Sequence, residues 1–177
     1  MHDGPTHLVI VGLMGSGKTT VGTALARRLG LPHRDSDVDL LARTGRSARA
    51  IAAAEGVEAL HELELQHLLD ALRVPEPSVI SAAASLVDTV SAREALTTPV
   101  AFVVWLRIDP ATAAMRARRS RHRPGHESLT VQAARRDPLF ASIADLVEDG
   151  TDDPGAIVER VAARWQAVRA AARDASG

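Results

Sequence analysis

Short apolar runs alternate along the chain with longer stretches in which apolar and polar residues mix. The run HLVIV at 7–11 is apolar throughout, which predicts a central strand of a parallel sheet that is covered on both faces. The segment VAFVVWLRI at 100–108 predicts the clearest strand, and PEPSVISAAAS at 75–85 predicts another after its Pro-rich turn. A shorter strand is expected to end near Asp35.

The stretches between these strands have the spacing of amphipathic helices. In the segment 57–74 apolar residues stand at positions 60, 63, 68, 69 and 72, which places them on one face of a helix. Further helices are expected at 21–30, at 45–56, at 110–123, at 129–147 with a break at Pro138, and at the end of the chain. The alternation predicts an α/β fold, a three-layer αβα sandwich around a parallel sheet of about five strands. No linker divides the sequence, so residues 1–177 are expected to form one domain.

The amino-acid composition limits the kinds of molecule that the chain is expected to bind. The chain is 46% hydrophobic and 24% charged with a net charge of −1, which is typical of a globular protein with no general attraction to nucleic acid or anionic lipid. It has no cysteine, so a disulfide framework and a thiolate metal site are both excluded. No apolar run is long enough for a membrane span, and the N-terminal residues do not resemble a signal peptide. A cytoplasmic location and a monomeric state are the resulting expectations.

The residues GLMGSGKT at 12–19 match the phosphate-binding pattern G-x-x-x-x-G-K-[ST], between a predicted strand and a predicted helix. Glycines let backbone N–H groups turn toward phosphate oxygens, and the helix N-terminus adds partial positive charge. Lys18 is placed to reach the β- and γ-phosphates of ATP, and the Thr19 hydroxyl to ligate Mg²⁺. The expected nucleotide-binding residues of this loop are Gly12, Met14, Gly15, Ser16, Gly17, Lys18, Thr19 and Thr20. A chance glycine-rich turn is the competing interpretation, which the flanking strand and helix disfavour.

Two carboxylates, Asp35 and Asp37, follow the short second strand. Ligands of open α/β sheets bind beyond the carboxyl ends of the strands, which is where this pair is expected to lie. One carboxylate could hold Mg²⁺ through water while the other orients or deprotonates an attacking hydroxyl. The alternative is that an aspartate here caps the next helix, since Asp is a good N-cap regardless of function.

Taken together, these segments resemble the shikimate kinase family. The resemblance rests on GLMGSGKTTVG, LARRLGLP, DSD, TGRS followed by EG, the Arg123-Pro124 pair in a basic segment, and RDPLF at 136–140. It covers nearly the whole chain and implies a P-loop kinase of the nucleoside-monophosphate-kinase type, with a mobile lid at about 115–128. The implied activity is transfer of the γ-phosphoryl group of ATP to a ring hydroxyl of shikimate.

The resemblance also implies roles for single residues, divided between the donor and the acceptor. On the donor side these are Lys18 and Thr19 for the phosphates and magnesium, Asp35 for the magnesium shell, and Arg116 against the adenine. On the acceptor side they are Asp37 at the acceptor hydroxyl, Arg123 in the lid at the transferring phosphoryl group, and Arg136 facing the substrate carboxylate.

The acceptor side departs from the family pattern at two places. Leu60-His61 stands where the family has a Phe-Arg pair whose arginine grips the carboxylate, and histidine cannot form that bidentate contact. Ala83, Ala84 and Ser85 stand where the family ends its third strand in three glycines. Their side chains are expected to raise the floor of the acceptor pocket, since glycine alone leaves bare backbone there. Efficient phosphorylation of shikimate itself is therefore not expected.

Three functions remain open from the sequence. The first is a small-molecule kinase that uses Mg²⁺-ATP and a hydroxyl acceptor, with no nucleic acid or membrane as partner. The second is a nucleotide-binding protein without transferase activity, because the changes on the acceptor side would also arise if nucleotide binding were retained without transfer. A separate departure is the acidic segment 148–154, which stands where the family has a basic residue near the adenine. The third is a nucleic-acid-handling protein that uses the arginine-rich run at 116–123, but such a patch would be expected to carry aromatic neighbours.

Overall fold

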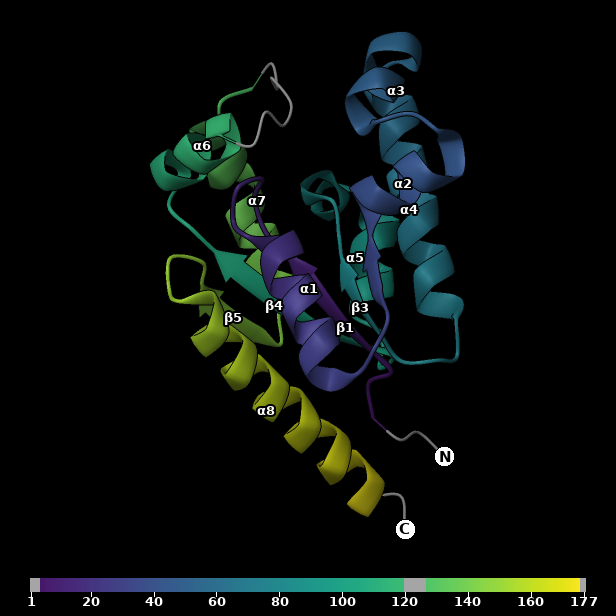
Figure 1. Ribbon diagram of the computed structural model, residues 1–177, viewed down its shortest axis with the longest axis vertical. Helices are drawn as coiled ribbons and strands as arrows, with labels where there is room; N and C mark the ends of the chain where they lie inside the picture. The colour runs from purple at the N-terminus through teal and green to yellow at the C-terminus, as the bar shows by residue number, and fades with distance from the viewer. Residues whose placement is uncertain (1–3, 120–126, 176–177) are drawn as a thin grey trace.

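A parallel sheet of five strands runs through the centre of the molecule, which the computed structural model describes for residues 4–119 and 127–175 (Figure 1). The strands are β1 (His7–Val11), β2 (His33–Asp35), β3 (Ser78–Ser81), β4 (Ala101–Arg107) and β5 (Leu146–Asp149), in the spatial order β2-β3-β1-β4-β5. All four pairings are parallel. The predicted α/β sandwich with a five-stranded parallel sheet is confirmed.

Helices cover both faces of this sheet (Figure 1). They are α1 (Lys18–Leu29), α2 (Ser36–Thr44), α3 (Ala48–Glu55), α4 (Val57–Arg73), α5 (Val90–Leu96), α6 (Pro110–Arg119), α7 (Leu129–Ile143) and α8 (Pro154–Asp174), with a 3₁₀ turn η1 (Ala84–Asp88) after β3. The helices α1 and α8 lie on one face, and α4, α5 and α7 lie on the other. The helices α2 and α3 pack on α4 in a smaller apolar cluster beside the sheet.

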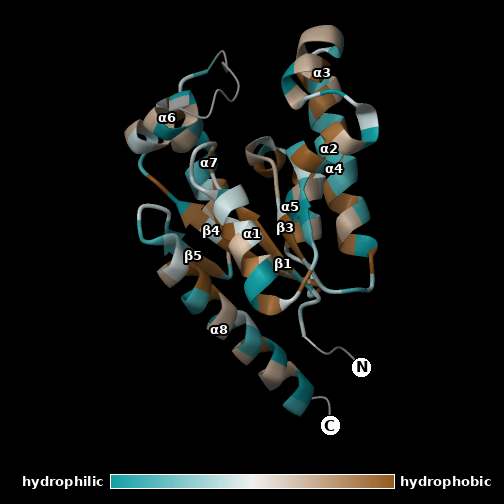
Figure 2. Cartoon of the chain, viewed as in Figure 1, coloured by the Kyte–Doolittle hydropathy of each residue, from teal (hydrophilic) through white to brown (hydrophobic). Residues whose placement is uncertain are grey.

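The central strand β1 shows why the sheet needs a cover on each face. Successive side chains of a strand point to opposite faces. Leu8 and Ile10 pack with Leu25 of α1 and with apolar residues of α8, whereas Val9 and Val11 pack with the helices of the opposite layer. The strand is buried along its whole length, as its continuous apolar sequence predicts. Figure 2 shows the same arrangement, with the hydrophobic residues gathered along the strands and the inner faces of the helices.

The strand order brings the loops that carry chemistry to one edge of the sheet. The strand β3 lies between β1 and β2 in the sheet, although β2 is the next strand after β1 along the chain. All five strands run in one direction, so the segments that follow β1, β2 and β3 leave the sheet side by side. These are the glycine-rich loop, the residues after Asp35, and the alanines after Ser81.

The segment 129–147 differs from the prediction of a helix that breaks at Pro138. The helix α7 passes through Pro138 without interruption and ends at Ile143, and the chain then forms the edge strand β5. Burial of Phe140 and Ile143 holds the helix together across the missing N–H of the proline. The backbone then turns into the sheet through Asp145, whose N–H donates to Val103 O at 2.9 Å and whose Oδ2 accepts from Val103 N at 2.7 Å.

No helix within residues 4–119 and 127–175 combines the length and the apolar character needed to cross a membrane.

The packing of α7 on the sheet yields a first prediction. Phe140 is 1% exposed and its ring stacks on Trp105 of β4, with the ring centroids 5.9 Å apart. We expect Phe140→Ala to lower the free energy of unfolding by about 3–5 kcal/mol, because it leaves a cavity under the helix. Urea denaturation measures the loss. Val131→Ala, on the exposed side of the same helix, is the control and should change stability by less than about 0.5 kcal/mol. Equal losses in the two variants would contradict the packing described.

A second prediction concerns His7 in β1, which is buried and bonded through Nδ1 to Ser78 Oγ at 2.9 Å and through Nε2 to Val74 O at 3.0 Å. Burial lowers the pKa of His7 below its ordinary value. The unfolded chain therefore binds a proton at a higher pH than the folded chain does, and stability falls as the pH drops through about 6.5.

We expect His7→Gln to lose less stability than the wild type between pH 7.5 and pH 5.5, because glutamine does not titrate. Urea unfolding at both pH values tests this expectation. A pH dependence that is unchanged in the variant would remove His7 as a source of the acid sensitivity.

Candidate nucleotide and acceptor site

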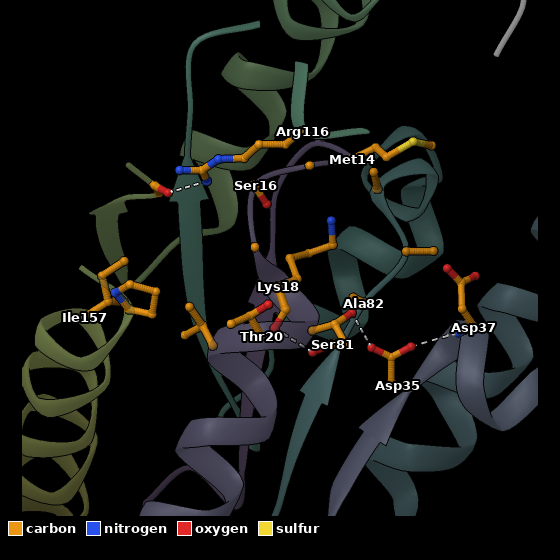
Figure 3. A pocket seen from close by; sticks show the side chains of 18 of the residues that line it. Met14, Ser16, Lys18, Thr20, Asp35, Asp37, Ser81, Ala82, Arg116 and Ile157 are labelled. Carbon is orange, nitrogen blue, oxygen red and sulfur yellow. Dashed lines mark hydrogen bonds between the residues drawn. The ribbon is translucent and has the colours of Figure 1, made fainter. Parts of the chain in front are cut away.

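A cavity of about 620 Å³ opens at the carboxyl edge of the sheet (Figure 3). Its walls are the segments 14–21, 35–37, 81–84 and 150–154, together with Arg116 and Ile157. In Figure 3, Asp37 lies at one end of the cavity and Arg116 and Ile157 lie at the other, with Lys18 between them. The strand order therefore places the loop with the phosphate-binding sequence in the middle of the cavity, between the Asp37 end and the Arg116 end.

Two glycines give the loop between β1 and α1 its shape. Gly12 has φ +147° and Gly15 has φ +83°, values that side-chain-bearing residues rarely adopt. A Cβ at Gly12 would lie 2.6 Å from Leu106 O, and one at Gly15 would lie 2.4 Å from Ala113 O. The loop thus packs backbone against backbone at both places, and only glycine fits.

The N-terminus of α1 is open toward the cavity. Gly17 occupies the N-cap position and has no side chain with which to cap the first N–H groups of the helix. The Nζ of Lys18 donates to Gly12 O and to Leu13 O, each at 2.9 Å, which holds the amine at the mouth of the loop. The Ser16 hydroxyl is buried, and none of the residues in the described ranges forms a hydrogen bond with it. A phosphate group would supply acceptors for the helix N-terminus and for this hydroxyl.

Asp35 joins the loop to the second strand. Its Oδ2 accepts a hydrogen bond from Thr19 Oγ1 at 2.8 Å, and its Oδ1 accepts from the backbone N–H groups of Asp37 and Val38 at 3.1 and 3.3 Å. The helix-capping interpretation of Asp35 is therefore confirmed. The same carboxylate also places an oxygen beside the Thr19 hydroxyl, and oxygen donors of this kind suit Mg²⁺. Residues Thr19 and Asp35 therefore fit a magnesium ion held mainly by phosphate and water.

The floor of the cavity comes from the end of β3. The Ser81 hydroxyl lies 2.8 Å from His33 Nε2 and donates to Lys18 O at 3.2 Å, so it braces the start of α1. Burial lowers the pKa of His33 and thereby favours its neutral form. Ala83 and Ala84 line the cavity, and Ala83 has an ordinary φ of −62°. The alanine methyl groups thus occupy the floor, and that of Ala83 does so without backbone strain.

Several residues predicted for the site lie elsewhere. Ser85 is buried behind the floor and its hydroxyl donates to Glu64 Oε2 at 2.5 Å. His61 lies half-buried on α4 and Arg136 lies buried on α7, and neither is among the residues that line the cavity. Arg123 and half of the expected lid, residues 120–126, fall outside the described residues.

Arg116 does lie at the cavity, at the end opposite Asp37 (Figure 3). Its Nη1 donates to Gly150 O at 2.8 Å, which links α6 to the loop after β5. The acidic residues of that loop form bonds within their own region. Asp149 accepts from the Thr151 hydroxyl at 2.6 Å, which lowers the pKa of its carboxyl, and Asp153 caps α8 by accepting from Ala156 N at 3.0 Å. The acidic residues of this segment thus stabilise the loop and the start of α8. The sequence pattern of 148–154 did not indicate this role.

Sequence reasoning missed several residues that line the cavity, among them Ser81 and Ile157. Ser81 carried a usable signal, because it is the last residue of a strand that ends at the ligand-binding edge. Ile157 carried none, because an apolar residue on a long helix is expected in the core.

The chain matches the family model described as "Shikimate kinase" over residues 14–166. Among curated relatives, the shikimate kinase of Dechloromonas aromatica is 34% identical over 151 residues, which cover 82% of this chain and 81% of that protein. The shikimate kinase of Mycobacterium bovis is 33% identical over 165 residues, covering 89% and 92%. Among solved structures, the shikimate kinase from Acinetobacter baumannii in complex with shikimate superposes with a TM-score of 0.82 at 25% identity, covering 89% of this chain and 90% of that one.

The geometry of the loop predicts the effect of filling it. We expect Gly15→Ala to weaken ATP binding at least about tenfold, because the methyl group pushes the loop away from Ala113 and turns its N–H groups aside. Gly30→Ala is a matched control, since Gly30 also has a positive φ, +67°, but has nothing within 4 Å of the added Cβ. It should cost about 1–2 kcal/mol of stability and leave ATP affinity unchanged. Calorimetric titration with ATP measures both variants, and equal affinities would refute the role given to Gly15.

Proposed function

We propose that this chain, which belongs to the shikimate kinase family, transfers the γ-phosphoryl group of ATP to a hydroxyl group of a small molecule. The family and the matching structures are small-molecule kinases. The observation that carries the proposal is the placement of Asp37 and the open N-terminus of α1 in one cavity (Figure 3). A phosphate donor and a hydroxyl acceptor could meet between them.

The donor would lie along the phosphate loop. Backbone N–H groups of the loop and of the first turn of α1 would hold the phosphate oxygens, with the Ser16 hydroxyl as a further donor. The amine of Lys18 would leave the loop carbonyls for the β- and γ-phosphates. Arg116, from the far end of the cavity, would face the base.

Magnesium would be held by Thr19, with Asp35 supporting it from its place beside the threonine hydroxyl. When bound, the ion would neutralise part of the negative charge that the phosphates carry and develop during transfer.

Asp37 would act on the acceptor. It follows the Asp35 cap in the first turn of α2, and its side chain is exposed at the end of the cavity opposite Arg116 (Figure 3). The acceptor oxygen would form a bond to the γ-phosphorus as the bond from that phosphorus to the β–γ bridging oxygen breaks, and ADP would leave. The hydroxyl proton would pass to the Asp37 carboxylate, which also orients the hydroxyl before transfer.

Shikimate is bound by the related enzyme from A. baumannii, but we infer that it is a weak acceptor for this chain. The methyl groups of Ala83 and Ala84 take up space on the cavity floor. His61 stands on α4 where the family carries an arginine, and it lies away from the cavity lining. The acceptor therefore needs hydroxyl groups that reach Asp37 while its body stays clear of the floor.

Two substitutions test the proposal. We expect Lys18→Ala and Asp37→Asn each to lower the rate of acceptor-dependent ADP release by about 10²–10⁴-fold, since each removes a group that acts on the transferring phosphoryl or on the attacking hydroxyl. The measurement is a coupled ADP-release assay with Mg²⁺-ATP and a panel of hydroxyl compounds. Asp70→Asn, which alters an exposed carboxylate on α4 distant from the phosphate loop, should retain the wild-type rate.

Unchanged turnover in Asp37→Asn would remove Asp37 from the mechanism. Tight, Lys18-dependent ATP binding with no ADP release for any compound in the panel would favour the nucleotide-binding protein without transferase activity.

A further inference from the structure

We propose that the acceptor of this chain is an uncharged hydroxyl compound, and that Asp88 sets this selectivity by binding Arg136, the arginine that the resemblance to the family assigns to a substrate carboxylate. The inference rests on the proposed function, since it concerns the acceptor end of the same cavity. It adds to that function a class of substrate and a specificity-determining residue outside the cavity lining.

The first argument is the charge of the acceptor end. The charged side chains that line this end in the described part of the chain are the carboxylates of Asp35 and Asp37. The cationic lining residues are Lys18, in the phosphate loop, and Arg116, at the donor end (Figure 3). A carboxylate on the acceptor would thus approach two like charges before it met a cation.

The second argument is the state of Arg136. Its Nε and Nη2 donate to Asp88 Oδ2 at 3.0 and 2.7 Å, and its Nη1 donates to Gln132 Oε1 at 2.7 Å. The guanidinium group that a ligand carboxylate would need is therefore already bound to the Asp88 carboxylate, through two donors to one oxygen. The Arg136 side chain is only 9% exposed and that of Asp88 is 25% exposed, so the pair is largely, though not fully, buried.

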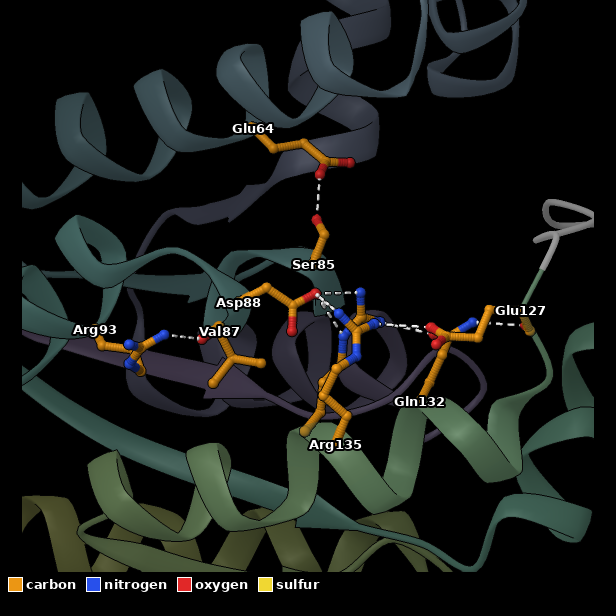
Figure 4. A network of polar contacts seen from close by, with 9 residues as sticks. Glu64, Ser85, Val87, Asp88, Arg93, Glu127, Gln132 and Arg135 are labelled. Carbon is orange, nitrogen blue, oxygen red and sulfur yellow. Dashed lines mark hydrogen bonds and ion pairs between the residues drawn. The ribbon is translucent and has the colours of Figure 1, made fainter.

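The third argument is that Asp88 is held in place by more than one partner. Arg135 Nη1 approaches the same Oδ2 at 3.3 Å, while Arg135 Nη2 donates to Glu127 Oε2 at 2.7 Å. Asp88 ends the η1 turn that begins at the cavity floor, and the two arginines come from α7. Figure 4 shows Asp88 and Arg135 meeting between the two elements.

An anionic acceptor could use Arg136 only by displacing Asp88. That exchange would take the main counter-ion, Arg136, away from the Asp88 carboxylate. Its Oδ1 is already buried and has no hydrogen-bond partner among the described residues. Removing one partner of a buried ion pair is strongly unfavourable. A neutral polyhydroxyl compound avoids this exchange and needs only hydrogen bonds to groups such as the Asp37 carboxylate.

A pair of probes that differ only in charge tests the inference. Shikimate carries a carboxylate, and its methyl ester carries the same ring hydroxyls without the charge. We would measure the dissociation constants of both by calorimetry, in the presence of Mg²⁺ and a non-hydrolysable ATP analogue, for the wild type and Asp88→Asn. We expect the wild type to bind the ester at least as tightly as shikimate, and Asp88→Asn to shift the ratio toward shikimate by about tenfold or more.

One further variant serves as a control, and another replaces Asp88→Asn if that variant does not fold. Glu94→Gln removes one exposed negative charge from α5 and should leave the ratio unchanged, which separates the effect of Asp88 from that of net charge. If Asp88→Asn does not fold, Asp88→Ser supplies a smaller neutral residue at the same position, with a hydroxyl that Arg136 can bond.

The outcomes decide between the alternatives. A wild type that prefers shikimate by tenfold, or a ratio unchanged by loss of the Asp88 charge, would overturn the inference. If the wild type binds neither probe, new shikimate binding in Asp88→Asn supports the inference and its absence refutes it. Because these are binding measurements, they stay independent of turnover, and loss of ATP-analogue binding or of ADP release would count against the proposed function instead.

Discussion

The first backbone N–H groups of α1 govern the rest of the site, because the helix begins at a glycine that cannot cap them. Such a helix end is stabilised by an anion, and the fold is arranged so that one can reach it. The strand β1 delivers the loop to the centre of the sheet edge, and its glycines let the loop lie against the carbonyls of Leu106 and Ala113. The neighbouring strands then supply a carboxylate on one side and a floor on the other.

Buried charge is the second recurring feature, and in each case it fixes one element relative to another. Glu64 of α4 accepts from Ser85 behind the floor, and Glu148 of β5 pairs with Arg160 of α8 at 2.6 Å. Asp88 and Arg136 join the end of η1 to α7. Such pairs add little net stability but are costly to break singly, so they hold the cavity walls in one arrangement.

The parts of this architecture that follow from local sequence could be predicted, and those that depend on distant partners could not. The phosphate loop is a contiguous pattern between a strand and a helix, so both its position and its residues were predictable. The strand β5 was not predicted, because acidic residues are not typical of a strand. Glu148 is buried there only because Arg160 of α8 bonds to it. Ser85 was expected in the pocket, but the η1 turn starts one residue earlier and directs its hydroxyl to Glu64. Asp88 drew no attention because its meaning depends on Arg136, 48 residues further along the chain.

The amine that bridges Gly12 and Leu13 belongs to the only lysine in the sequence; arginine supplies all the other side chains counted with it as basic. Apart from the chain terminus, this protein therefore presents a single primary amine to an acylating reagent. That amine lies at the mouth of the phosphate loop, where a bound polyphosphate would cover it. The rate at which it is modified is thus a direct chemical gauge of whether the loop is occupied, with no other side chain contributing to the signal.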